Sequence, residues 1–174
     1  CWHYQRAAFR GLVRTVYYDQ RSHGRSGRSP LAHATVEQLA GDLERVLEDI
    51  THDDPVVLVG HSMGGMTIMS LAERRPELFG TKVRGVALLS TTAGGLDPGR
   101  ILFPMLPAGF GSGIVTRVVG ALARGHKAVD ALRHRGHDVA LAVTDAYAFG
   151  PDVPGDLVQF VYDMLNRTPF DVVA

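Results

Sequence analysis

Short apolar runs alternate along the first half of the chain with stretches in which apolar residues recur every three or four positions. Residues 12–18, 56–59 and 83–90 are rich in Val and Leu and predict three buried strands. Between these strands, residues 35–50 and 66–75 have apolar side chains at helical spacing and predict two helices. Strands that alternate with helices of this length predict an α/β fold, a parallel sheet with helices on both faces.

Local signals support these helices. Thr35 stands where an N-cap is expected, and Gln38 follows three residues later as in a capping box. Pro76 limits the second helix, because proline cannot continue the hydrogen-bonding pattern. Residues 2–10 also predict a helix.

The pattern changes after residue 95. Residues 97–174 contain no clear strand, and residues 156–165 predict a helix. We therefore expect two regions: a partial α/β core over 1–95, and a mostly helical cap or lid, itself truncated, over 96–174.

Residues 56–65 read V-V-L-V-G-H-S-M-G-G and carry the strongest chemical signal. An aliphatic strand that runs into G-x-S-x-G and then into a helix is the pattern of a nucleophile elbow. Ser62 would lie on a sharp, strained turn as the nucleophile. A phosphate-binding turn is disfavoured, because no lysine follows the glycines.

The neighbours of the serine have supporting roles in this interpretation. Gly60 and Gly64 lack a Cβ atom, which would let strand and helix cross closely, and Gly65 extends the zone of small residues. His61 adjoins the nucleophile within the elbow. Met63 begins the helix, so its backbone N–H is predicted to bind a developing oxyanion.

Composition excludes several classes of protein. The formal net charge is zero, which argues against a nucleic-acid binder that works by general electrostatics. A single cysteine, Cys1, excludes an internal disulfide framework. No uninterrupted apolar stretch is long enough to span a membrane. The sequence predicts no metal and no cofactor, and a cytoplasmic location is the default expectation.

The capped helix, the G-H-S-M-G-G elbow and the V-A-L-L-S-T-T strand together resemble the α/β-hydrolase family, in particular its serine esterase-, lipase- and peroxidase-like members. The turn Y-D-Q-R-S-H-G-R-S is similar to the family's R-G-H-G-x-S. The resemblance covers most of the first 95 residues and implies an acyl-enzyme formed at Ser62, with Met63 as one oxyanion donor.

The resemblance also implies that this chain is a fragment. In the family the nucleophile is followed by an acid and then by a late histidine, and neither is expected in this chain. The second oxyanion donor and one central strand would precede Cys1. None of the eight histidines is predicted to be the general base. Residues 1–174 alone are therefore expected to be nearly inactive.

Substrate preference is the least constrained feature. Thr91 and Thr92 follow the third strand at its carboxyl end, where ligands bind in open α/β sheets, and are candidates for the pocket. Phe103 and Phe110 are candidates for an apolar lid. These residues predict a small-molecule, apolar acyl substrate. Amide, lactone, thioester or carbon–carbon cleavage and cofactor-free peroxidation stay open, as does the oligomeric state.

A second hypothesis is a non-catalytic hydrolase-like protein that uses the pocket to bind a ligand. The intact elbow argues against it, because a binding protein has little reason to keep a strained serine.

Overall fold

A parallel β–α–β unit forms the centre of the described structure. The computed structural model describes residues 2–95, 117, 121, 149–168 and 172. Strand β1 (Val56–His61) leads into helix α3 (Met63–Arg74), and β2 (Val83–Leu89) returns beside β1. The two strands pair in parallel, with Leu58 opposite Val86 and His61 opposite Leu89. This unit confirms the parallel sheet with helices that the sequence predicts.

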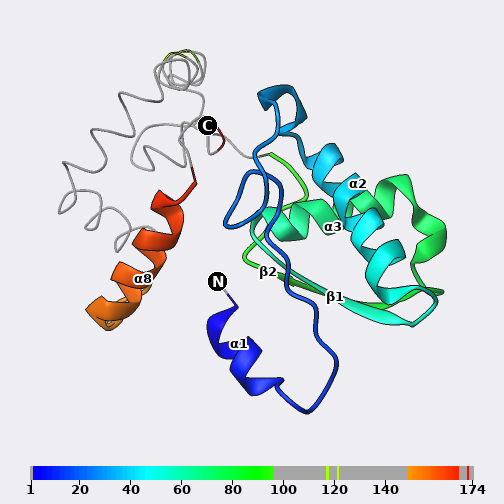
Figure 1. Cartoon of the computed structure of the whole chain (residues 1–174), viewed down its shortest axis with the longest axis horizontal. Coiled ribbons are helices and arrows are strands. Elements are labelled where there is room, and N and C mark those ends of the chain that lie inside the picture. The colour runs from blue at the N-terminus through cyan, green and yellow to red at the C-terminus, as the bar shows by residue number, and fades with distance from the viewer. Residues whose placement is uncertain (1, 96–116, 118–120, 122–148, 169–171, 173–174) are drawn as a thin grey trace. The chain divides into compact units, whose positions relative to one another are not determined.

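Helix α2 (Val36–Val46) lies beside α3 on one side of the two strands (Figure 1). Thr35 is its N-cap as expected, and its hydroxyl oxygen accepts the Gln38 N–H at 3.2 Å. The helix continues into one wider turn, η2 (Leu47–Thr51). A short 3₁₀ turn, η1 (Leu31–His33), precedes α2, and another, η3 (Pro76–Leu78), follows α3 where Pro76 was expected to stop it.

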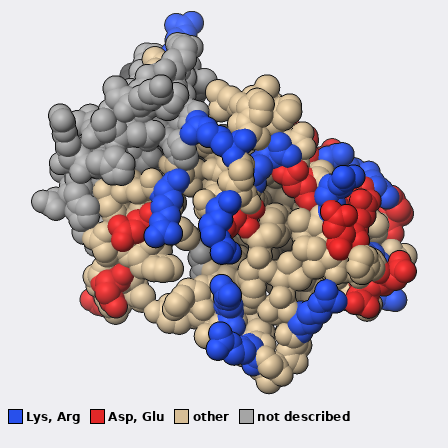
Figure 2. Space-filling view, viewed as in Figure 1, with Lys and Arg blue, Asp and Glu red and all other residues tan. Residues whose placement is uncertain are grey.

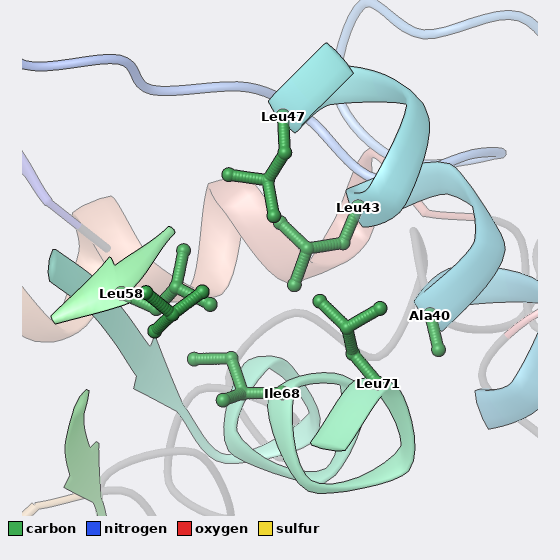
Figure 3. Close-up of a cluster of buried hydrophobic side chains, with 7 residues drawn as sticks. Ala40, Leu43, Leu47, Leu58, Ile68 and Leu71 are labelled. Carbon is green, nitrogen blue, oxygen red and sulfur yellow. The ribbon is translucent and has the colours of Figure 1, made fainter. Parts of the chain in front are cut away.

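The core is an aliphatic cluster between these helices and the strands. Side chains from α2 and η2 meet those from α3 and β1 (Figure 3). Its buried members are Ala40, Leu43, Leu47, Leu58, Ile68, Leu71 and Val83. At the outer ends, Arg74 donates to the Glu37 carbonyl at 2.7 Å and Arg75 pairs with Glu44, so α2 and α3 are fixed by polar contacts as well as by packing.

Helices α2 and α3 cover one face of the two strands (Figure 1). Val57 and Val59 alternate with the buried Leu58, so they point to the other face, and both are exposed. A second helical layer on that face stays a prediction. Acidic and basic side chains lie close together over α2 and α3 on the face shown in Figure 2.

The prediction of a strand at residues 12–18 is wrong. This segment has no regular structure, and most of it is exposed, including Leu12 at 76%. A strand needs a neighbour for its backbone groups, and the described sheet contains β1 and β2 alone. The apolar pattern is present, but no strand in the described part of the chain pairs with it.

Two other boundaries also differ from expectation. Helix α3 begins at Met63, three residues before the predicted start, because Ser62 itself is the N-cap. Strand β1 runs on through Gly60 and His61. Strand and helix therefore meet at a single residue.

The chain divides into two compact units, residues 29–119 and residues 1–28 with 120–174. The second unit contains α1 (His3–Ala8) and α8 (Gly155–Asn166), which confirm the helices predicted at 2–10 and 156–165. The rings of His3 and Phe160 lie 5.6 Å apart between these two helices. The predicted boundary after residue 95, and the rest of the cap, lie outside the described residues. No helix in the described residues is long and apolar enough to cross a bilayer.

Candidate active site

Ser62 occupies the single-residue turn between β1 and α3. Its φ and ψ are 51° and −121°, in a region that residues with a side chain rarely adopt. Such a conformation costs roughly 1–3 kcal/mol and persists only where the surroundings impose it. The side chain is exposed and makes no capping hydrogen bond to α3, so the hydroxyl is not used to begin the helix.

Backbone contacts hold this turn on both sides. The Ser62 N–H donates to the Leu89 carbonyl at 3.0 Å, which ties the elbow to the end of β2. The Ser62 carbonyl accepts the N–H groups of Gly65 at 2.9 Å and Met66 at 3.3 Å. The strained residue is thus held by the sheet through its amide and by the first turn of the helix through its carbonyl.

Gly60 is required by the close crossing of strand and helix. A Cβ atom at this position would lie 2.6 Å from the Gly64 carbonyl oxygen and 2.7 Å from the Gly65 nitrogen. Backbone atoms cannot easily move away, so no larger residue fits. The role that the sequence predicted for Gly60 is confirmed.

The structure does not require a glycine at position 64 for this crossing, and the tight position within the helix is Gly65. A Cβ atom at Gly64 would meet nothing within 4 Å. At Gly65 it would lie 2.5 Å from both Oγ1 and Cγ2 of Thr91. Within α3 the tight position is therefore one residue later than the G-x-S-x-G pattern indicates, and its neighbour is the side chain of Thr91, which follows β2.

Met63 is the first residue of α3. The N–H groups in the first turn of a helix have no carbonyl partner within that helix, and they lie at the positive end of its dipole. The Met63 N–H therefore has the geometry of an anion-binding donor beside the Ser62 hydroxyl. Its use as an oxyanion donor stays a prediction.

Of the two threonines after β2, Thr91 contacts the elbow and Thr92 contacts the loop that follows it. The Thr91 hydroxyl donates to the Ser62 carbonyl at 2.7 Å. The Thr92 hydroxyl donates to the Gly94 carbonyl at 2.6 Å. Their place in the pocket stays a prediction, and the sequence analysis missed the contact of Thr91 with Ser62. The signal was present, because the carboxyl ends of adjacent parallel strands meet at one edge.

The remaining candidates are less well defined by the structure. His61 is exposed at the end of β1, and Nδ1 of His23 lies 2.8 Å from the Arg21 carbonyl in the turn after the segment at 12–18. Phe103 and Phe110 lie outside the described residues. Within the part of the chain that is described, no three His, Cys, Asp or Glu side chains are placed to hold a metal ion.

Comparison with known proteins gives the family. The sequence model of the alpha/beta hydrolase family matches residues 1–173. The chain belongs to this family. Its elbow is the segment on which family members carry their nucleophile.

Three curated relatives match parts of the chain. Over 86 residues it is 38% identical to the sn-1-specific diacylglycerol lipase ABHD11 of Mus musculus, covering 49% of this chain and 26% of the relative. Over 78 residues it is 31% identical to Epoxide hydrolase 1 of Caenorhabditis elegans, and this match covers 44% of this chain and 19% of the relative. The sn-1-specific diacylglycerol lipase ABHD11 of Danio rerio is 40% identical over 60 residues, and this match covers 34% of this chain and 18% of the relative. The matches thus span about a quarter or less of each relative. No solved structure matches.

Proposed function

We propose that the protein is a serine hydrolase that cleaves a carboxylic ester or a related acyl substrate through an acyl-enzyme at Ser62. The observation that carries this proposal is the conformation of Ser62. A strained serine that is exposed at the N-terminus of a helix, and that does not cap the helix, is poised for nucleophilic attack.

In the proposed reaction the Ser62 oxygen attacks the carbonyl carbon of the substrate while its proton passes to a histidine. The negative charge that develops on the carbonyl oxygen is bound by the Met63 N–H. The alcohol leaves with the proton from the histidine, and water then releases the acyl group. The family's order of nucleophile, acid and histidine supports a base supplied by a part of the protein other than residues 1–174.

Serine at the elbow favours acyl transfer over epoxide opening. Family members that open epoxides carry an aspartate there, whose carboxylate forms the ester intermediate. One relative is named an epoxide hydrolase, whereas two are named diacylglycerol lipases. The serine at position 62 supports the chemistry of the second kind. We propose a small-molecule, apolar acyl substrate, which rests on the apolar residues expected in the lid. A cytoplasmic location stays a prediction.

Labelling with a fluorophosphonate probe tests the proposal in the full-length protein. Such probes react with an activated serine, so we expect rapid labelling that Ser62→Ala abolishes. Hydrolysis of p-nitrophenyl butyrate should fall by about 10⁶-fold in the same variant. Ser70→Ala, which removes another serine hydroxyl from α3, is the matched control and should keep both activities.

Two results would contradict the proposal. Labelling that survives Ser62→Ala would place the reactive group elsewhere. A folded full-length protein that no fluorophosphonate labels would favour the non-catalytic ligand-binding protein instead.

A further inference from the structure

The Thr91 side chain contacts the elbow backbone from outside β1 and α3. Its hydroxyl donates to the Ser62 carbonyl at 2.7 Å across 29 positions of sequence. The carbonyl also accepts the Gly65 and Met66 N–H groups, both from the direction of the helix. Since a carbonyl oxygen has two lone pairs, the hydroxyl adds a restraint from a second direction.

The backbone around Thr91 is built to bring this hydroxyl to the elbow. Ser90, directly before it, has φ 45°, a left-handed conformation that residues with a side chain rarely adopt. Gly65 leaves the space that Thr91 fills, since a Cβ atom there would lie 2.5 Å from the hydroxyl oxygen and from the methyl carbon. A strained turn and a missing side chain thus both serve the same contact.

The contact acts on the oxyanion donor through the peptide plane. The Ser62 carbonyl and the Met63 N–H belong to one trans peptide unit, which is planar and nearly rigid. Their directions are opposite and cannot change independently. A hydrogen bond that fixes the carbonyl therefore also fixes the direction in which the Met63 N–H points.

We propose that Thr91 is a positioning residue that aligns the Met63 N–H for oxyanion binding by holding the Ser62 carbonyl. This inference rests on the proposed serine chemistry. In this role Thr91 acts through the Ser62 peptide unit and not by contact with the reacting atoms. The effect of losing its hydroxyl falls on the step in which negative charge develops, so it lowers kcat more than it raises KM.

The test compares Thr91→Val with Thr91→Ser in the full-length protein. Valine keeps the shape but removes the hydroxyl, whereas serine keeps the hydroxyl. We expect Thr91→Val to lower kcat and the maximal rate of fluorophosphonate labelling by about tenfold, with KM within about twofold. The loss stays below that of a deleted oxyanion donor, because two N–H groups still hold the carbonyl. For Thr91→Ser we expect kcat, KM and the maximal labelling rate to stay within about twofold of the unsubstituted protein.

Thr51→Val is the matched control. The Thr51 hydroxyl donates to the Leu47 carbonyl at 2.6 Å, so the same chemical change removes a hydroxyl–carbonyl hydrogen bond in η2. η2 precedes β1, whereas the elbow follows it. We expect Thr51→Val to lower the free energy of unfolding about as much as Thr91→Val does and to leave kcat unchanged. The pH dependence of labelling should be the same in Thr91→Val as in the parent, because Thr91 does not move the proton.

Three outcomes would overturn the inference. They are an unchanged kcat in Thr91→Val, a fall in kcat that serine does not rescue, and a fall that Thr51→Val reproduces. If Thr91→Val does not fold, the Thr91→Ser and Thr91→Ala pair differs by the same hydroxyl, and equal labelling rates in that pair would overturn it too. Absence of labelling in the unsubstituted protein would overturn this inference together with the proposed function, whereas the other results leave the proposed function intact.

Discussion

Strand β1 and the segment at residues 12–18 are both short, aliphatic and rich in valine, but their surroundings differ completely. β1 pairs with β2 along its length and buries Leu58, which is 8% exposed, in the core. In the segment at 12–18, Leu12 is 76% exposed and the described residues offer no strand beside it. The difference shows that an apolar stretch becomes a strand only where the fold supplies a neighbour.

The neighbour of β1 is supplied by the chain itself. A parallel pair needs a crossover, and α3 provides it directly between the two strands. The close crossing at Gly60 and the contact of Leu89 with Ser62 then hold strand, helix and second strand together. Nothing equivalent follows residue 18, where the chain enters a turn held by Asp19, whose carboxylate accepts the Arg25 N–H at 3.0 Å.

The largest expected effect comes from breaking the crossing at the end of β1. Gly60→Ala places a Cβ atom 2.6 Å from the Gly64 carbonyl oxygen, where backbone must shift to make room. We expect it to lower the free energy of unfolding by more than about 4 kcal/mol, enough to remove most of the stability of a domain. Urea unfolding followed by circular dichroism measures this loss.

Gly64→Ala is the matched control for that substitution. Nothing lies within 4 Å of its added Cβ atom, and alanine is favoured over glycine within a helix. We expect stability to be unchanged or to rise by up to about 1 kcal/mol. Equal destabilisation by the two alanines would contradict the geometry of the crossing.

A smaller effect separates the two apolar stretches directly. Leu58→Ala and Leu12→Ala make the same chemical change at a buried and at an exposed position. We expect Leu58→Ala to lower the free energy of unfolding by about 2–5 kcal/mol, because it leaves a cavity in the core. Leu12→Ala should change it by less than about 0.5 kcal/mol. A comparable loss at Leu12, measured by the same urea unfolding, would show that this segment is packed in solution.

Much of the core could be predicted from local signals. The capping of α2 by Thr35, the stop at Pro76 and the aliphatic runs of β1 and β2 each follow from one or a few neighbouring residues. The elbow was found in the same way, because G-x-S-x-G after an aliphatic strand describes a local turn.

The rest depends on contacts between distant residues. The prediction of a strand at 12–18 is wrong because an apolar pattern does not show whether another strand lies beside the segment. The glycine that is tight against its neighbours is Gly65 and not Gly64, because the atoms it meets belong to Thr91, 26 positions away in the numbering. The hydrogen bond from Thr91 to Ser62 spans 29 positions and has no local signature.

The smallest expected effect concerns the start of α2, the helix that covers the buried side of β1. The pKa of the Glu37 carboxylate lies below its ordinary value of 4.5. The causes are hydrogen bonds from the backbone of Glu37 itself and from the Thr35 hydroxyl, with a smaller contribution from the charge of Arg74. Because the folded-state pKa is depressed, the stabilisation is fully present above the unfolded-state pKa and is lost as the pH falls through the folded-state pKa. Glu37→Gln should therefore lower the urea midpoint slightly at pH 7, and its difference from the parent protein should shrink below about pH 4.5.

Glu48→Gln removes an exposed carboxylate of the same charge from η2 and leaves the first turn of α2 intact. It separates the loss of the cap contacts from a change in net charge, because only Glu37 carries the contacts that depress its pKa at the start of the helix. Two results would contradict this prediction. One is an equal fall in the urea midpoint at pH 7 for Glu37→Gln and Glu48→Gln, and the other is a Glu37→Gln difference that persists unchanged to pH 3. Either result would mean that the Glu37 carboxylate does not stabilise α2. The advantage of β1 over residues 12–18 would then lie in its apolar packing and its pairing with β2 alone.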